Sequence, residues 1–339
     1  MCAGGRLLMV PQAQVKFTSH FAELLNEFLV SKRNCGYKYN REAKYLKNFD
    51  EYLASTDMKP DNCNVVRIYD WLKKREHESL KTFSIRNCLY RQLYHYFEAM
   101  NTNAFPQPPN ARERIFSSGF TPYIFTREQI KQIFHAIDIE SKSVLGPNFH
   151  RIAALLFRML YGTGLRINEA LSLKVENVWL DRGILEILES KNGGSRLVPM
   201  SNSLCKRGTD YIFNNQYLQH DYLFQKKDGS PMHKNRVYDW FRWIIWRVRI
   251  PHLGRGKGPR LHDLRHTFAV HSLQNAVKRG IDPYAYIPIL SVYLGHKTVN
   301  ATERYLRLTA EAYPDFTKDI ERIMNKIIPE VNSLEESQR

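Results

Sequence analysis

The 339-residue sequence predicts a mostly α-helical protein of two domains, with a small antiparallel β-sheet in the second domain. Three observations carry this prediction. Apolar residues recur at the spacing of helices through most of the chain, a proline-rich segment follows Asn101, and the period changes to that of β-strands only around "KNGG". The hydrophobic share of 43% and the aromatic share of 12% are typical of a packed protein and not of a disordered chain.

The first domain is predicted to be a set of helices over residues 16–101, preceded by an extension over residues 1–15. In "SHFAELLNEFLVSKR", Phe21 begins an apolar stripe. The segments "REAKYLKNFDEYLAS", "VVRIYDWLKKR" and "SIRNCLYRQLYHYFEAM" repeat this pattern, and in the last we expect Met100 to face the core. The proline-rich "NTNAFPQPPNARERIFSSGFTPY" cannot be helical throughout, so a linker is expected over residues 102–122.

The second domain is expected over residues 123–310. Helices are predicted in "TREQIKQIFHAID" and "NFHRIAALLFRMLYGTG". In "RGILEILESKNGGSRLVPMS", two short alternating runs flank Asn192 and Gly193, which predicts a β-hairpin. Helices return from "HKNRVYDWFRWIIWRVRI" onward, and a tail over residues 311–339 carries an amphipathic helix in "DFTKDIERIMNKIIPEV" that has Phe316 on its apolar stripe.

The chain is strongly basic. Lys and Arg number 50 against 34 Asp and Glu, which gives a net charge of +16. Such an excess makes a folded protein repel itself unless a polyanion is present, and nucleic acid is the usual polyanion. We therefore expect a nucleic-acid partner. The flexible, basic "GRGKGPR" supplies three candidate contacts: Arg255, Lys257 and Arg260.

The cysteines indicate a reducing compartment. They are odd in number and widely scattered: Cys2, Cys35, Cys63, Cys88 and Cys205. No pair has the spacing of metal ligands, so free thiols are expected. "MCAGGRLLMV" is too weakly apolar for a secretory signal, and no apolar stretch approaches ~18 residues, so we expect a cytoplasmic chain with no membrane partner.

Two segments place a cation where an anion can bind. In "YGTGLRINEALSL", Arg166 falls in the opening turn of a helix, where unpaired N–H groups and the helix dipole already favour an anion. Glu169, one turn later, is placed to pin that guanidinium. Lys191 lies at the tip of the predicted hairpin, where a flexible ammonium can reach a substrate. Taken alone, each of these groups is more often an ordinary surface charge.

In a third segment, "LHDLRHTFAVHSL", His262, Arg265 and His266 share one face of a helix. Such a face suits a metal ion, a phosphate or solvent. The two histidines have the spacing of a zinc helix, but zinc also needs a carboxylate and a third ligand, and Arg265 would repel it. Arginines with histidines suit a phosphodiester, whose oxygens gain negative charge in the transition state. A phosphate site is therefore predicted.

The fourth segment, "YLGHKTVNATERYLRLT", carries His296 and a tyrosine nine residues later. Gly295 is expected to end one helix. Asn300 and Glu303 resemble a capping box that starts the next helix, which places Tyr305 in its early turns. Taken alone, a tyrosine at this position would normally be a half-buried core residue, and the chain has 19 tyrosines.

Taken together, TGLRINE, a hairpin lysine, HxxRH, and LGH followed by a tyrosine resemble the tyrosine recombinases of the phage integrase family. The likeness is sharp over roughly residues 166–308 and rests on layout before them. It implies a helical core-binding domain in residues 16–101, an α+β tyrosine-recombinase catalytic domain in residues 123–310, and closure of both around duplex DNA. The segment between the histidine motifs, with Pro283 and Pro288, is several residues longer than is usual in this family.

The resemblance also implies which side chains act. Six positions match the family's catalytic residues: Arg166, Lys191, His262, Arg265, His296 and Tyr305. Two more, Glu169 and His266, hold supporting positions. Tyr305 would be the nucleophile, and His262 is expected to accept its proton. The two arginines would clamp the scissile phosphate, and Lys191 would protonate the departing 5′ oxygen.

The implied function is that of a site-specific recombinase or integrase. It would cleave and rejoin duplex DNA through a covalent 3′-phosphotyrosyl intermediate and integrate or excise a mobile element. No metal ion or other cofactor is expected, because the phosphotyrosyl bond keeps the energy for rejoining. The implied partners are double-stranded DNA recombination sites, further copies of the chain in a tetramer of two dimers, and accessory proteins. The implied location is the bacterial cytoplasm, on DNA.

Several alternatives stay open. The tail helix either folds back on its own domain or docks on a neighbouring protomer. A type IB topoisomerase uses closely similar chemistry, although the motif layout favours strand exchange. A DNA-binding regulator without catalysis is disfavoured because every expected reactive side chain is present, and a metallohydrolase is disfavoured by Arg265.

Overall fold

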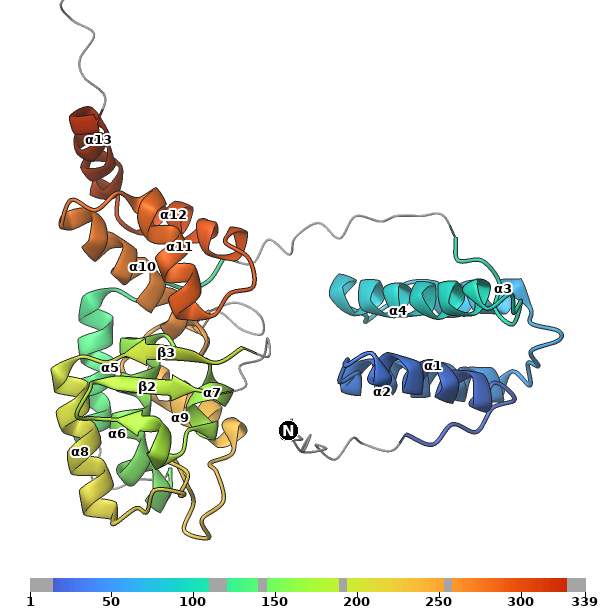
Figure 1. The fold of residues 1–339 in the computed structure, drawn as a ribbon, viewed down its shortest axis with the longest axis horizontal. Helices are drawn as coiled ribbons and strands as arrows, with labels where there is room; N and C mark the ends of the chain where they lie inside the picture. Colours follow the sequence, from blue (N-terminus) through green and yellow to red (C-terminus); the bar gives the residue numbers. More distant parts are fainter. Residues whose placement is uncertain (1–14, 110–120, 140–144, 189–193, 253–257, 328–339) are drawn as a thin grey trace, which may run out of the picture. The chain divides into compact units, whose positions relative to one another are not determined.

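The computed structural model describes residues 15–109, 121–139, 145–188, 194–252 and 258–327. Most of these residues are helical, and the strands form one three-stranded antiparallel sheet, which confirms the predicted fold class (Figure 1). None of the described helices is long and apolar enough to cross a membrane. The chain divides into two compact units, Met1–Phe120 and Thr121–Arg339, each with its own apolar core.

The first unit is a set of helices around an apolar core. Its described helices are α1 (Ala22–Asn34), α2 (Asn40–Ser55), α3 (Val65–Leu72) and α4 (Leu80–Ala99). Helix α2 contacts α1 and α4, and α3 packs on α4. Leu25, Phe28 and Phe49 are buried in this core, so the stripes that predicted the helices do face one another. All four predicted helices are confirmed.

Two details of the first unit differ from prediction. Met100, expected in the core, is 51% exposed. Helix α4 ends one residue earlier, at Ala99, so Met100 is its C-cap residue and no longer lies on the apolar stripe. The core also extends into the segment expected to be a linker. Ala104 and Phe105 are buried in it, and Tyr90 Oη donates to the Pro106 carbonyl over 2.7 Å. The chain therefore stays packed on the helices beyond the end of α4.

The second unit contains the sheet and the other described helices. In chain order its elements are α5 (Arg127–Ile139), α6 (Pro147–Thr163), α7 (Ile167–Ser172), the 3₁₀ turn η1 (Val175–Asn177), β1 (Val178–Trp179), β2 (Ile184–Ile187), β3 (Arg196–Pro199), α8 (Asn202–Asn215), α9 (Lys234–Arg247), α10 (Asp263–Lys278), α11 (Pro283–Leu294), α12 (Asn300–Ala312) and α13 (Asp315–Ile327).

Strands β2 and β3 form the predicted hairpin. They pair antiparallel with Leu185 opposite Val198, both buried, and β1 pairs with the other edge of β2. The hairpin tip with Lys191 lies outside the described residues. Helix α8, which follows the hairpin, was not predicted, because Gly208 and several asparagines weaken its helical pattern. The glycine fits the packing, since a Cβ there would lie 2.8 Å from Leu180 Cδ2.

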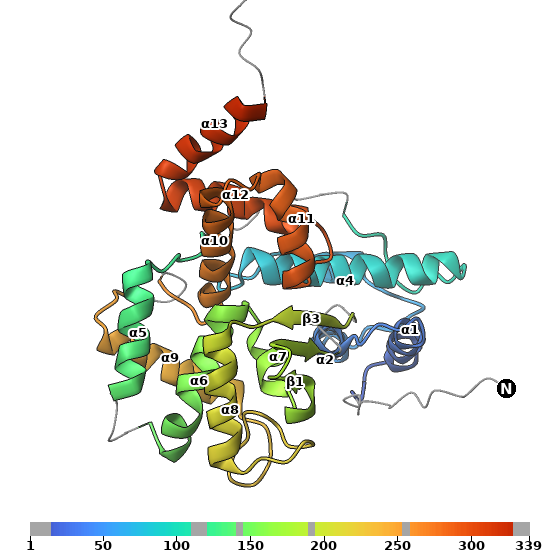
Figure 2. The same cartoon turned by 60° about the vertical axis from the view of Figure 1, so that its left-hand side comes forward.

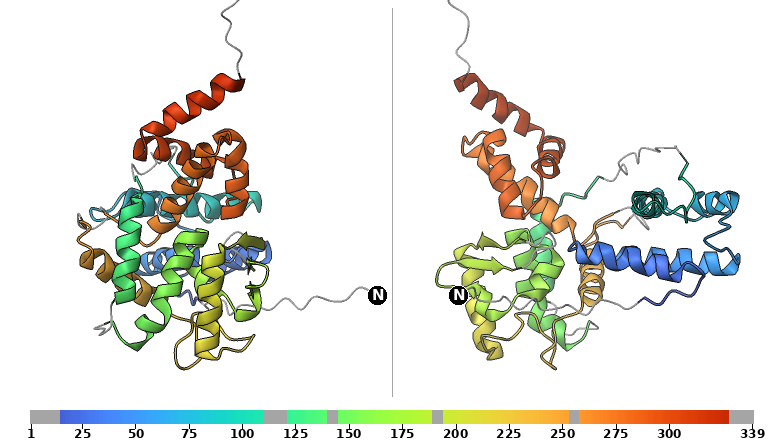
Figure 3. Two further views of the ribbon diagram at one scale, coloured as in Figure 1. Left: turned by 90° about the vertical axis from the view of Figure 1, so that its left-hand side faces the viewer. Right: turned by 45° about the vertical axis from the view of Figure 1, so that its right-hand side comes forward.

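Two helices link the parts of the second unit. Helix α6 contacts α5, α7, α8 and α10, and α10 in turn contacts α11, α12 and α13. Figures 2 and 3 show α10, α11 and α12 gathered together, with α13 leading away from the end of α12. Gly164 ends α6 at a φ of +61°, and a Cβ at this position would lie 2.5 Å from Phe268 Cδ1 of α10. Only glycine lets the end of α6 approach α10 this closely.

The α11–α12 region follows prediction in part. Gly295 ends α11 at a φ of +65°, as expected, and the long segment between the histidine motifs forms α11, with Pro283 at its first position and Pro288 inside it. The prediction of a capping box formed by Asn300 and Glu303 is wrong. Val299 is the N-cap, no side chain caps the helix, and Asn300 is already its first residue. The reason is local geometry, since Val299 itself has helical angles of −63° and −37°.

The amphipathic helix expected in the tail is present as α13. Phe316 is 2% exposed and belongs to a core cluster that includes Leu273 of α10 and Leu308 of α12. Ile320 and Ile323 are partly buried against the same cluster. The first turns of α13 therefore pack on their own unit.

Candidate active site

Arg265 is a buried cation in the first turn of α10, with 2% of its surface exposed. Its Nη1 donates to the Gly164 carbonyl over 2.7 Å, and its Nη2 donates to the Leu294 carbonyl over 2.6 Å. These carbonyls lie at the ends of α6 and α11, where the helix dipoles are negative. Burial, followed by the positive charge of Arg166, lowers the pKa of Arg265 to about 10, so the guanidinium stays charged at neutral pH.

Glu169 holds two further arginines together. Arg166, the N-cap of α7, donates from Nη1 to Glu169 Oε1 over 2.7 Å, and Arg196 of β3 donates from Nη2 to Oε2 over 2.8 Å. Arg166 also donates to the Gly295 carbonyl over 3.1 Å, and Arg196 to the Tyr293 carbonyl over 2.9 Å. One carboxylate thus joins α7, β3 and the end of α11.

Glu169 is ionised at all ordinary pH values. Burial alone would raise the pKa of its carboxyl, but hydrogen bonds from Arg196 and from the backbone N–H of Arg166 outweigh burial and lower the pKa to about 2. Arg265 also interacts electrostatically with Glu169 and with the two arginines that Glu169 binds. A single negative charge is therefore surrounded by three guanidinium groups. The surplus of positive charge suits an anion such as a phosphodiester.

Tyr305 lies in the second turn of α12 and is fully buried. Its Oη is 2.9 Å from His266 Nδ1, and its ring stacks on His296 with 6.3 Å between centroids and an interplanar angle of 18°. His296 Nδ1 lies 2.7 Å from Thr302 Oγ1. The exposed Arg304, next to Tyr305 in the chain, places Nη2 3.3 Å from the same His266 nitrogen.

Both histidines beside Tyr305 are neutral. Burial, followed by nearby positive charges that include Arg304, lowers the pKa of His266 to about 2. Burial, followed by the charge of Arg265, lowers the pKa of His296 to about 4. A neutral imidazole can accept the tyrosine proton, whereas a protonated one has no lone pair to offer.

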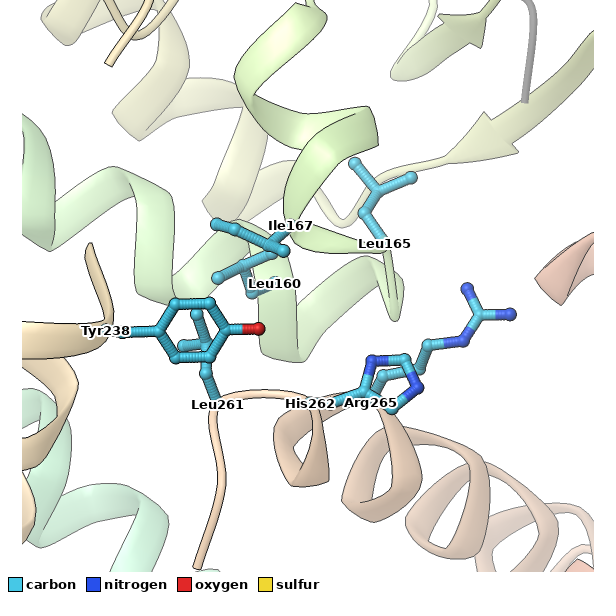
Figure 4. Close-up of a pocket in the computed structure, with 7 residues that line it drawn as sticks. All are labelled: Leu160, Leu165, Ile167, Tyr238, Leu261, His262 and Arg265. Atoms are coloured by element: carbon cyan, nitrogen blue, oxygen red, sulfur yellow. The ribbon is translucent and has the colours of Figure 1, made fainter. Parts of the chain in front are cut away.

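His262 caps α10 beside a small pocket. Its ring centroid lies 4.9 Å from that of His266, at an interplanar angle of 84°. Figure 4 shows the pocket, in which His262 and Arg265 lie near each other at the start of α10 and the remaining lining is mostly apolar. The lining residues are Leu160, Leu165, Ile167, Tyr238, Leu261, His262 and Arg265. His262 is exposed, so it is accessible to a bound anion.

The structure brings most of the predicted site together. The cluster consists of Arg166, Glu169, His262, Arg265, His266, His296 and Tyr305. Lys191, Arg255 and Lys257 lie outside the described residues. Arg260 is exposed just before α10, where its backbone N–H donates to Asp263 Oδ2 over 2.8 Å. The described residues contain no group of three or more His, Cys, Asp or Glu side chains arranged to hold a metal ion.

Two features of the cluster were not foreseen. The Tyr305 hydroxyl contacts His266, whereas His262 was expected to accept its proton. Arg196, which shares Glu169 with Arg166, was not singled out. Strand alternation carries the signal for it, because Arg196 lies two residues from the buried Val198 and therefore on the same face of β3.

The fold and the cluster define a class of enzyme. A tyrosine hydroxyl lies against a neutral histidine and beside several guanidinium groups, and these are the kinds of group that act on a phosphodiester.

Comparisons with known proteins identify the family. The phage integrase family profile matches residues 124–312. The tyrosine recombinase XerA of Pyrococcus furiosus is 30% identical over 192 residues, which are 56% of this chain and 59% of that protein. The structure of XerH site-specific recombinase bound to palindromic difH substrate matches with a TM-score of 0.62 and 21% identity, over 91% of both chains. The Tn1549 transposon integrase in complex with transposon right end DNA matches with a TM-score of 0.59 and 17% identity, over 83% of this chain and 94% of that one.

Because the family profile spans more than half of it, this chain belongs to the phage integrase family. Its activity is site-specific DNA recombination of the tyrosine recombinase type, which makes it a DNA strand transferase. The two alternative functions, a type IB topoisomerase and a DNA-binding regulator without catalysis, are not favoured by these matches.

The first prediction concerns the carboxylate that holds the arginines. Glu169→Gln removes the charge and keeps the shape of the side chain. Breaking a buried ion pair typically costs about 3–5 kcal/mol, so the free energy of unfolding at pH 7 should fall by about that much. The deficit should shrink as the pH falls from 4.5 toward 2, because Glu169 contributes this stability only while it is ionised in the folded protein. Urea denaturation at several pH values measures both effects.

Glu128→Gln is the matched control, because the pair of Glu128 with Lys131 is 67% and 76% exposed and an exposed pair contributes little. A Glu169→Gln variant as stable as the wild type at pH 7, or a deficit that does not change with pH, would show that the ionised carboxylate does not hold the cluster together.

Proposed function

We propose that this recombinase cleaves DNA with Tyr305 and forms a 3′-phosphotyrosyl bond. The observation that carries the proposal is the 2.9 Å contact between Tyr305 Oη and Nδ1 of the neutral His266. Arg166 and Arg265 are assigned to the scissile phosphate, because their charges exceed what Glu169 neutralises. Loss of one such preorganised donor typically lowers the rate by about 10²–10³-fold.

The proposed step balances in protons and bonds. Tyr305 gives its proton to His266 Nδ1 as its oxygen attacks phosphorus, and the bond from phosphorus to the 5′ oxygen breaks. We assign protonation of that 5′ oxygen to Lys191, a phosphate contact to His262, and orientation of the tyrosine ring to His296. Rejoining reverses each movement, so the step needs no metal ion and no nucleotide.

The nucleophile has to move before it reacts. Tyr305 is 0% exposed, so its hydroxyl reaches a phosphate only after the side chain rotates or α12 shifts. Helix α12 carries Tyr305 and leads directly into α13. A contact between α13 and a neighbouring protomer is therefore able to change the position of Tyr305.

We propose that the first unit is the core-binding domain and the second the catalytic domain, and that both act on duplex recombination sites. The net charge of +16 supports a duplex partner, and Arg255, Lys257 and Arg260 remain the proposed contacts in the segment before α10. Integration or excision of a mobile element in a bacterial cytoplasm is the proposed biological role, in line with the family name and with the similar transposon integrase.

We propose four protomers, arranged as two dimers on two sites and aided by accessory proteins, with the tail linking neighbours. The burial of Phe316 shows that α13 starts on its own unit. A trans contact therefore falls to the end of α13 and the residues after it, and such contacts close into a ring by symmetry.

The second prediction concerns the nucleophile. Tyr305→Phe should abolish covalent adduct on a nicked duplex that carries the recombination site, because the attacking oxygen is gone. Stability should fall by only about 1 kcal/mol, the cost of one hydrogen bond, and DNA affinity should not change. Denaturing gels with and without protease read the adduct. Tyr313→Phe is the control, since it also removes a hydroxyl bonded to a histidine, His271, over 2.7 Å. Adduct from Tyr305→Phe would assign the attack to another tyrosine, such as Tyr293.

The third prediction concerns Lys191. Lys191→Ala should slow cleavage of ordinary DNA by about 10²–10⁴-fold, the usual contribution of general acid–base catalysis. A substrate with sulfur at the 5′ bridging position has a better leaving group and should largely restore the rate. Single-turnover cleavage measures both, with the exposed Lys206→Ala on α8 as control. Equal slowing on both substrates would leave Lys191 as a phosphate contact and not an acid.

The fourth prediction concerns the tail. Deleting residues 328–339 should spare folding and binding of one site but abolish the paired-site complex and strand exchange. Deleting residues 315–339 should also lower the melting temperature, because Phe316 leaves its core cluster. Native gels with one and two DNA sites, alongside thermal unfolding, separate these effects. Recombination by the shorter deletion at the wild-type rate would refute a trans contact beyond α13.

A further inference from the structure

Two donors meet at one nitrogen of His266. Tyr305 Oη lies 2.9 Å and Arg304 Nη2 lies 3.3 Å from His266 Nδ1. A guanidinium has donors only, so Nδ1 must present its lone pair, and the ring proton must sit on Nε2. The tyrosine hydroxyl therefore donates to the same lone pair. This geometry fixes His266 in the tautomer that is able to take the Tyr305 proton.

Arg304 differs from its neighbours in how it is held. His266 and Tyr305 are 3% and 0% exposed, whereas Arg304 is exposed and lies over the Tyr305 ring, with Cζ 5.3 Å from the centroid. Arg265 is fixed by two backbone carbonyls, and Arg166 by a carboxylate and a carbonyl. Arg304 is thus able to leave His266 for a phosphate without disturbing the core, and guanidinium groups bind phosphate oxygens strongly.

We propose that Arg304 is a positioning residue that couples the arrival of a phosphodiester to the basicity of His266. While Arg304 donates to Nδ1, it competes with the Tyr305 proton for the lone pair and disfavours protonation of the ring. When a phosphodiester enters the cluster, the guanidinium moves to a phosphate oxygen. The lone pair is then left to Tyr305, whose proton passes to Nδ1 as its oxygen attacks phosphorus. This proposal rests on the proposed role of Tyr305.

The other groups that face His266 act in the same direction. Burial is the largest cause of the lowered pKa of His266, and the charged or titratable neighbours that lower it further are His262, Arg304, Arg265 and His296. Of these four groups, Arg304 is the one that donates to Nδ1 in the described contacts. Its departure therefore changes a hydrogen bond as well as a charge.

The test uses ¹⁵N NMR of the His266 ring in the full-length chain at neutral pH, with inorganic phosphate as the probe. In the wild type, phosphate should shift the Nδ1 resonance downfield, toward that of a free imine nitrogen, because one donor leaves. In Arg304→Met, Nδ1 should start at the downfield position, and phosphate should not move it. A merely structural role for Arg304 would not make the phosphate response depend on it.

Arg307→Met is the matched control, because it removes an equally charged side chain from α12 that is 75% exposed and pairs with Glu311 instead. It should behave as the wild type. An unchanged Nδ1 resonance in Arg304→Met, or a phosphate response that survives the substitution, overturns the proposal. Arg304→Ala carries the same expectation if the Met variant fails to fold. The measurement needs no DNA cleavage, so failure of the Tyr305 proposal leaves it readable, and failure of the coupling leaves Tyr305 as the proposed nucleophile.

Discussion

The two hydrogen bonds from Arg265 to the carbonyls of Gly164 and Leu294 are the contacts on which the catalytic arrangement depends. They bind the start of α10 to the ends of α6 and α11. A buried guanidinium without partners would cost several kcal/mol, so separating these three helix ends would lower the stability of the fold by a similar amount. Gly295, the residue after Leu294, accepts a hydrogen bond from Arg166 through its carbonyl. This bond helps to position the next residue, His296, whose ring stacks on that of Tyr305.

The electrostatics of the cluster serve two ends at once. The positive charges suit a phosphate, and together with burial they keep His266 and His296 unprotonated. A base in such surroundings is neutral at any physiological pH, yet it is also weak. In the proposed reaction, the basicity of His266 therefore rises when an anion offsets the surrounding charge, so that phosphate binding and removal of the Tyr305 proton depend on the same charges.

Long periodic patterns made most of the fold predictable. The helices of the first unit, the hairpin and the glycine that ends α11 all follow from apolar spacing or turn chemistry. Short or mixed signals failed: glycine and asparagine hid α8, and the backbone around Val299 made a capping side chain unnecessary. The motif arginines, histidines and tyrosine could be chosen from sequence. That Tyr305 meets His266 and not His262 could not, because that choice depends on how α12 packs on α10.

The burial of Tyr305 has a consequence for the search for a target site along a chromosome. Fully burying a large apolar side chain stabilises by about 1.5–3 kcal/mol, so an exposed ring is roughly 10- to 160-fold rarer than a buried one. A sequence-specific protein meets about 10⁶–10⁹ competing genomic positions for each true target. At nearly all of them the Tyr305 oxygen, the proposed nucleophile, stays buried in the core. With Tyr305 as the proposed nucleophile, the packing of one aromatic ring therefore lowers the frequency of stray strand breaks during the search by the same factor.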